Sequence, residues 1–217
     1  MAIFKDYLEN KSPLILHGAL GTEMESLGYD ISGKLWSAKY LLEKPEVIQE
    51  IHETYIAAGA DLITTSSYQA TLPGLMEAGL TEREAEQVIA LTVQLAKAAR
   101  DKIWATLDET EKAERPYPLI SGDVGPYAAY LANGSEYTGD YGQVTVETLK
   151  DFHRPRIHVL LDQGVDLLAL ETIPNHLEAQ ALVELLAEEF PEVEAYISFT
   201  VQEPGTISDG TSLDRKS

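Results

Sequence analysis

The sequence predicts an α/β fold of the (β/α)8 TIM-barrel type, of which residues 1–217 form a single incomplete domain with about five strands and four helices. Short apolar runs alternate with helical stretches, as in parallel sheets covered by helices. The phrase Gly59–Ile63 is echoed by Gly164–Leu168, and each marks a helix stop followed by a strand start. An open doubly wound sheet is the alternative, but Gly18–Thr22 lacks the third glycine of a dinucleotide-binding fingerprint.

Five apolar runs have the length and composition of buried parallel strands. These runs are Leu14–Leu16, Asp61–Ser66, Pro118–Ser121, Asp166–Leu170 and Ala195–Phe199. The first predicted helix begins at Pro45, which suits a first helical turn, and ends at Gly59. The second begins at Thr81, where Thr81 and Glu84 match a capping box, and continues to about Leu107.

The third predicted helix covers about Val144–Asp162 and is expected to bend at Pro155. The fourth begins at Asn175, which is expected to cap it together with Glu178. Between these elements, the polar stretch Asp108–Pro116 is expected to be a loop. The segment Gly122–Gly142 is too long for a mere connection, and long loops in compact domains are often functional.

The charge balance restricts the classes of partner. The chain has 16 basic and 36 acidic residues, a net charge of −20, which repels nucleic-acid phosphates and acidic membranes. No apolar run approaches the roughly 18 residues that span a bilayer. The first 13 residues carry charges and lack the apolar core of a signal peptide. We therefore expect small-molecule partners, no nucleic acid, no membrane and a cytoplasmic location.

The absence of cysteine restricts the chemistry. With no cysteine, the chain cannot form a disulfide, a thiolate nucleophile or a cysteine-ligated metal site from its own residues. The five histidines show no paired metal-binding spacing. His153 and His158 are five positions apart, which places them about 140° apart around a helix.

Polar residues follow the predicted strands at their C-terminal ends, where a barrel of this type carries its active site. These strand ends are His17–Glu23, Thr65–Gln69, Gly122–Tyr127, Glu171–Thr172 and Thr200. Each group alone is a weak signal. Five successive strand ends of this kind indicate a coherent functional rim.

The residues on this rim resemble one enzyme family. The runs HGALGTEMESLGYD, AGADLITTSSYQAT, SGDVGPYAAYLANGSEYTGDY, LALETIPN and ISFTVQEPGTISDGTSL are similar to the homocysteine S-methyltransferases. The resemblance extends from about Leu14 to Leu213 and corresponds to the N-terminal two-thirds of the family domain.

The resemblance implies a (β/α)-barrel that transfers a methyl group to the thiol of homocysteine and forms methionine. S-Methylmethionine and S-adenosylmethionine are both compatible donors. In the family, a zinc ion held by three cysteines deprotonates the thiol, whose pKa of about 8.5 leaves little thiolate at neutral pH. This chain ends at Ser217, before the positions of those cysteines, so we expect no bound zinc and no activity of the chain by itself.

Carried over onto this sequence, the resemblance implies specific substrate-binding residues. Glu171 matches the carboxylate that receives the amino group of homocysteine, and Tyr68 matches an aromatic residue near the substrate. Asp123 and Tyr127 belong to the motif after the third strand. Both are also predicted to contact the substrate.

The first strand end adds Thr22 and His17 to the predicted substrate-binding residues. His17 is a departure, because the family usually has an aspartate there and an imidazole cannot replace a fixed anion. We expect His17 to cap a neighbouring carboxylate or to lie in solvent rather than to bind metal.

The alternative hypothesis is a non-enzymatic α/β module that binds amino acids or self-associates. A barrel with about five strands leaves two strand edges and one flank of its core uncovered. Self-association through these edges is therefore an expectation under both hypotheses.

Overall fold

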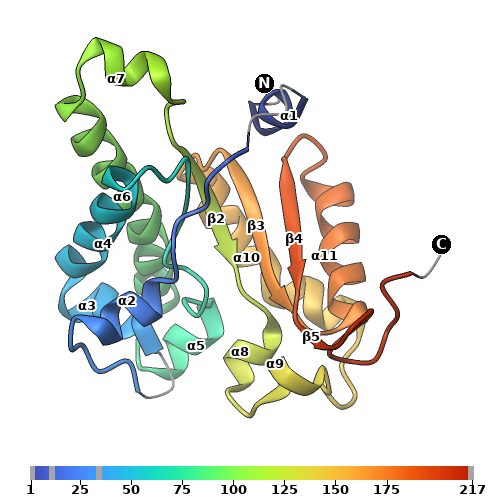
Figure 1. The fold of residues 1–217 in the computed structure, drawn as a ribbon. Helices are drawn as coiled ribbons and strands as arrows, with labels where there is room; N and C mark the ends of the chain where they lie inside the picture. Colours follow the sequence, from blue (N-terminus) through green and yellow to red (C-terminus); the bar gives the residue numbers. More distant parts are fainter. Residues whose placement is uncertain (1–2, 10–12, 33–35, 215–217) are drawn as a thin grey trace.

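The computed structural model describes residues 3–9, 13–32 and 36–214, which are arranged around a parallel four-stranded sheet (Figure 1). The strands are β1 (Leu62–Thr64), β2 (Leu119–Val124), β3 (Leu167–Ile173) and β4 (Ala195–Phe199). Their order in the sheet is β1-β2-β3-β4, so within the described residues it never reverses. A doubly wound sheet needs such a reversal, and the observed order is that of consecutive barrel strands.

Four long helices pack side by side along the sheet in chain order (Figure 1). They are α4 (Pro45–Ala57), α6 (Glu82–Thr106), α10 (Val146–Asp162) and α11 (His176–Glu189). The core lies between these helices and the strands, where Ile48, Ile89, Leu160 and Leu182 are fully buried. Burying each such side chain contributes about 1.5–3 kcal/mol, so the helix layer holds the sheet in shape.

Shorter elements lie at both ends of the strands. They are α1 (Ile3–Glu9), α2 (Leu20–Ser26), η1 (Trp36–Lys39), α3 (Tyr40–Glu43), α5 (Leu72–Glu77), α7 (Glu109–Glu114), α8 (Tyr127–Leu131), α9 (Ser135–Thr138) and the antiparallel pair β5 (Val201–Glu203) and β6 (Thr206–Ile207). Helix α1 lies at the N-terminal end of the sheet, where the Glu194 carboxylate accepts hydrogen bonds from the Phe4 and Lys5 amides at 3.0 and 2.8 Å. The C-terminal strand ends, at the opposite side, remain open for a site.

The predicted helix starts are confirmed. Pro45 occupies the first turn of α4, and the Thr81–Glu84 capping box is formed at the start of α6. Asn175 caps α11 by accepting from the Leu177 and Glu178 amides. The Glu178 side chain takes no part in that cap, because its carboxylate is buried in contacts with other residues.

Two predicted loops contain helices. The stretch Asp108–Pro116 was expected to be a loop, but it includes α7, whose start Asp108–Glu111 is a second capping box. The segment Gly122–Gly142 contributes its first residues to β2 and then forms α8 and α9. Short helices of this kind lack an apolar repeat long enough to be detected by periodicity.

The predicted first strand, Leu14–Leu16, is not a regular strand. It forms a single parallel bridge between Leu16 and Leu62, with the His17 amide donating to the Leu62 carbonyl at 3.0 Å. A strand needs a ladder of such bonds, and among the described residues this segment forms one bridge only. Ile15 and Leu16 consequently remain 57% and 52% exposed.

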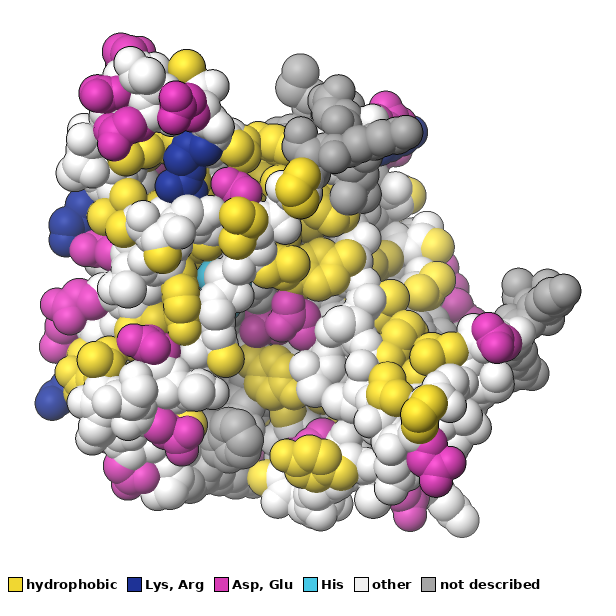
Figure 2. Space-filling view, in the orientation of Figure 1, with side chains coloured by type: hydrophobic (Ala, Val, Ile, Leu, Met, Phe, Trp, Pro, Cys, Tyr) yellow, Lys and Arg dark blue, Asp and Glu magenta, His cyan; other side chains and the backbone are white. Residues whose placement is uncertain are grey.

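Apolar side chains remain uncovered at both edges of the sheet. Besides Ile15 and Leu16, the set includes Phe199 and Val201 on or beside β4. Figure 2 shows apolar side chains around the hollow between these two edges. The last three residues of the tail, 215–217, lie outside the described residues. Within the described chain, none of the helices is both long and apolar enough to cross a bilayer.

We expect the purified chain to self-associate at micromolar concentration, because exposed strand edges and apolar surface favour edge-to-edge contact. Multi-angle light scattering measures this directly. The double variant Leu16→Lys, Val201→Lys, which places charge at both edges, should shift the protein toward the monomer. A monodisperse wild-type monomer at the same concentration would contradict the prediction.

Candidate functional site

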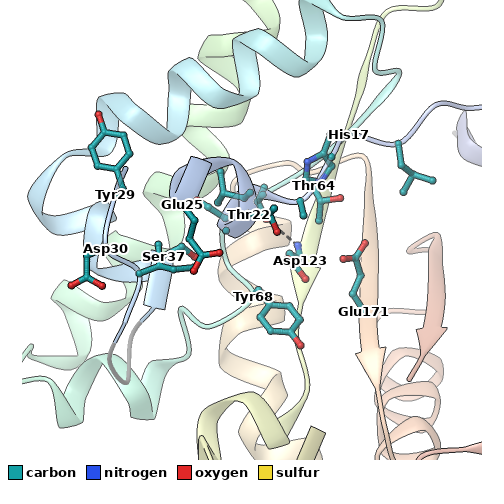
Figure 3. Close-up of a pocket in the computed structure, with 18 of the residues that line it drawn as sticks. His17, Thr22, Glu25, Tyr29, Asp30, Ser37, Thr64, Tyr68, Asp123 and Glu171 are labelled. Carbon is teal, nitrogen blue, oxygen red and sulfur yellow. Dashed lines mark hydrogen bonds between the residues drawn. The ribbon is translucent and has the colours of Figure 1, made fainter. Parts of the chain in front are cut away.

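A cavity of about 860 Å³ lies at the C-terminal ends of β1, β2 and β3, and α2 closes one side of it (Figure 3). Because parallel strands end at the same edge of a sheet, residues far apart in sequence meet here. Five of the six predicted substrate-binding residues line the cavity. These are His17, Thr22, Tyr68, Asp123 and Glu171.

Glu171 reaches the cavity from an irregularity in β3. The pairing of β3 with β4 shifts between Leu170 and Ile173, and Thr172 has a φ of +64°. This left-handed conformation is rare for a β-branched residue and costs about 1–2 kcal/mol. Bulges of this type redirect a side chain, and here the irregularity places Glu171 at the cavity wall.

Tyr196 on β4 fixes the orientation of that carboxylate. Its hydroxyl donates to Oε1 of Glu171 at 2.5 Å. Burial and the neighbouring Glu171 raise the pKa of Tyr196, so the phenol keeps its proton and remains the donor. Glu171 therefore presents an oriented anion to the cavity.

Asp123 is the second carboxylate of the cavity and is only 7% exposed. Its backbone amide donates to Oγ1 of Thr65 at 2.9 Å, which joins the ends of β1 and β2. Its Oδ1 atom is buried and has no hydrogen-bond partner among the described residues. Burial and the charge of Glu171 raise the pKa of Asp123 well above its ordinary value, while Arg156 opposes the shift.

Tyr68 lies on the loop after β1 and contacts the loop after β2. A Cβ atom at Gly125 would lie 2.5 Å from the Tyr68 carbonyl oxygen and 2.6 Å from its ring, so the close approach requires glycine. Burial raises the pKa of the Tyr68 hydroxyl, which therefore stays neutral. Tyr68 thus offers an aromatic wall with one polar end.

His17 packs among rings at the cavity edge. Its ring centroid lies 6.3 Å from that of His52 and 5.7 Å from that of Tyr55. Burial lowers the pKa of His17 to about 4, so it is neutral at neutral pH. Neither a carboxylate partner nor full exposure to solvent is seen for His17 among the described residues, so this packing replaces the expected arrangement.

Helix α2 contributes Thr22, together with cavity residues that the sequence reading did not select. These are Glu25 on the helix and Tyr29 and Asp30 in the turn that follows it. All of them lie within the run HGALGTEMESLGYD, which carried the resemblance. Their position in that run is the sequence signal that could have identified them as cavity residues.

Tyr127 lies outside the cavity. Its ring packs against Tyr130, Tyr141 and Phe152, with centroids 5.7, 5.6 and 4.9 Å away. Its backbone amide donates to Oε1 of Glu178 at 2.6 Å. This aromatic cluster supports the long loop after β2, and the structure does not place Tyr127 with the other predicted site residues.

A family model described as homocysteine S-methyltransferase matches residues 14–216. The chain belongs to the homocysteine S-methyltransferase family. It is 48% identical over 198 residues to homocysteine S-methyltransferase YbgG of Bacillus subtilis. This match covers 91% of this chain and 62% of that protein. It is 45% identical over 200 residues to homocysteine S-methyltransferase 1 of Zea mays, with 92% and 62% covered.

The metallated form of the homocysteine methyltransferase MmuM from Escherichia coli has a similar structure. The TM-score is 0.87 at 46% identity, covering 97% of this chain and 70% of that chain. The fold is therefore the barrel type of the homocysteine S-methyltransferases, of which part is present. This chain spans about 62% of the length of the curated relatives from Bacillus subtilis and Zea mays.

A buried polar network lies beneath the loops that carry Tyr68 and Asp123. Nε2 of His153 and Oε1 of Glu178 are 2.8 Å apart, and both side chains are fully buried. Nη2 of Arg156 donates to Nδ1 of His153 at 3.0 Å. Because arginine has no acceptor, Nδ1 must accept, so Nε2 carries the proton and donates to Glu178.

The same arginine joins the two loops. Its guanidinium donates to the carbonyl oxygens of Tyr68 at 3.0 Å, Ser67 at 3.3 Å and Gly125 at 2.6 Å. Burial lowers the pKa of Arg156 to about 10, so it remains charged at neutral pH. Sequence periodicity gave no sign of this role, because an arginine beside Pro155 on a helix usually lies in solvent.

We expect Glu178→Gln to lower the free energy of unfolding by about 1–3 kcal/mol, because the amide cannot accept from all three buried donors. These donors are the Tyr127 amide, His153 and the Tyr141 hydroxyl. Urea unfolding measures the change.

The matched control is Glu192→Gln at an exposed position, which should change stability by less than about 0.5 kcal/mol. Equal effects of the two substitutions would show that the network does not stabilise the chain.

Proposed function

We propose that this chain forms the substrate-binding rim of a homocysteine S-methyltransferase. The reaction transfers a methyl group from S-methylmethionine or S-adenosylmethionine to the homocysteine thiol and yields methionine. The observation that carries the proposal is the Glu171 carboxylate, oriented by Tyr196 at the wall of a cavity large enough for an amino acid. Membership of the family supports the reaction class.

The chain's own residues would bind and orient the substrate. Glu171 would accept hydrogen bonds from the substrate ammonium, a charge-assisted contact that is strong in a partly dry site. Tyr68 would cover the apolar part of the amino acid. Holding both substrates on one rim supplies the alignment that methyl transfer between sulfur atoms requires.

The zinc that the family resemblance implies does not fit the residues of this chain. The chain has no cysteine, and its described residues form no group of three His, Asp or Glu that would hold a metal ion. Zinc would supply thiol deprotonation, and none of the described residues form a group that could substitute for its cysteine ligands. We therefore infer that this chain alone binds substrate without transferring the methyl group.

A second candidate function follows from that mismatch. The binding cavity is formed, whereas the cysteine ligands are absent, which favours a module that binds amino acids without turnover. Its partners would be small molecules, since the net charge of −20 opposes nucleic acid and acidic membranes. The two candidates share the binding step and differ in the source of the metal ligands.

Replacing Glu171 by glutamine should weaken binding of homocysteine by roughly tenfold or more, because one charged hydrogen bond is lost. Isothermal titration calorimetry measures the dissociation constant. Glu25→Gln removes the same charge from another part of the cavity wall and should change it less than about twofold. Equal losses would indicate a general effect of negative charge and would contradict the role of Glu171.

Zinc should not bind stoichiometrically to the purified chain. Equilibrium dialysis against zinc, followed by metal analysis, should recover far less than one ion per chain. One tightly bound ion per chain would show that other residues replace the cysteines, and would overturn the proposed inactivity.

A further inference from the structure

Two carboxylates from different strands share the cavity. Asp123 projects from β2 and Glu171 from β3, and Figure 3 shows the Glu171 carboxylate turned toward the strand that carries Asp123. Two ionised carboxylates in a partly desolvated space repel each other, so such a pair tends to retain one proton.

The hydrogen bonds around the pair are unequal. The Glu171 carboxylate accepts a hydrogen bond from the Tyr196 hydroxyl. The Oδ1 atom of Asp123, a residue that is only 7% exposed, receives no donor from the described residues. An unpaired buried anion is costly, whereas a protonated carboxyl group loses little there. The proton therefore resides mainly on Asp123.

The other charged or titratable groups facing Asp123 do not reverse this distribution. Arg156 on α10 lies near enough to favour the anion, but its guanidinium hydrogen bonds go to loop carbonyls and to His153. Tyr68 and Tyr196 are neutral phenols because burial raises the pKa of each. His17, across the same cavity, is neutral above pH of about 4.

We propose that the Asp123 carboxyl group holds a proton in the empty cavity and that binding of a cationic amino-acid ligand expels this proton to solvent. The ligand class is an onium amino acid, which carries a fixed positive charge in addition to its ammonium. In the bound state the Asp123 carboxylate is ionised and faces a positive charge of the ligand. The inference rests on the proposed function, because it assumes that the cavity binds such a substrate.

The sign of the pH dependence follows. The ligand binds the protein with Asp123 deprotonated, so affinity rises with pH while Asp123 is protonated in the free protein. One linked proton corresponds to about a tenfold change in the dissociation constant per pH unit. The dependence disappears once Asp123 is fully ionised in the free protein. A fixed sulfonium charge does not titrate, so it adds nothing to this profile.

Calorimetry of S-methylmethionine binding in two buffers of different ionisation enthalpy, at equal pH, counts the released protons. The wild-type chain should release close to one proton for each ligand bound. Asp123→Asn should release none and should bind with a pH-independent constant. Asp214→Asn removes an exposed carboxylate outside the cavity and should release the same number of protons as the wild type.

Infrared spectroscopy tests the proton without relying on the ligand. The wild-type minus Asp123→Asn difference spectrum at neutral pH should show the C=O stretch of a protonated carboxyl group. Absence of this band would overturn the inference, even if S-methylmethionine binds as proposed. A band that persists while no ligand binds would instead overturn the proposed function, together with the expulsion step.

Discussion

The loops after β1 and β2 meet over a single buried guanidinium. Arg156 donates to the carbonyl oxygens of Tyr68 and Gly125, one on each loop. It also donates to His153, which in turn donates to Glu178. Backbone carbonyls at strand ends have no sheet partners, so without these donors the loops would turn toward solvent. The wall formed by Tyr68 and the position of Asp123 both depend on this arrangement.

Regular elements were predictable wherever their signal was local. The capping residues Thr81 and Asn175 mark helix starts because their side chains satisfy nearby amides, a pattern visible within four residues. Buried strands such as β3 are recognisable because both faces are covered and the run is continuously apolar. Strand ends then locate the rim, which is why His17, Asp123 and Glu171 were found together.

Features that depend on distant neighbours were not predictable. The Leu14–Leu16 run is apolar enough for a strand, but it forms only a single bridge with Leu62 and no ladder of hydrogen bonds. Tyr127 follows a rim motif, yet its ring packs into the aromatic cluster with Phe152. The sequence indicates a surface position for Arg156, whereas the packing of α10 against the sheet buries it. In each case tertiary packing, which periodicity does not contain, decided the outcome.

Thr172 shows that folding and binding make competing demands on β3. Glycine would adopt its left-handed backbone without steric cost, so a sequence selected for stability alone would have glycine there. Threonine adds a hydroxyl that opposes the rise in the pKa of Tyr68 on the opposite wall. The strained backbone thus holds a carboxylate at the cavity wall at a cost in stability. Any process that relaxed this backbone would move Glu171 away from the position that Tyr196 orients.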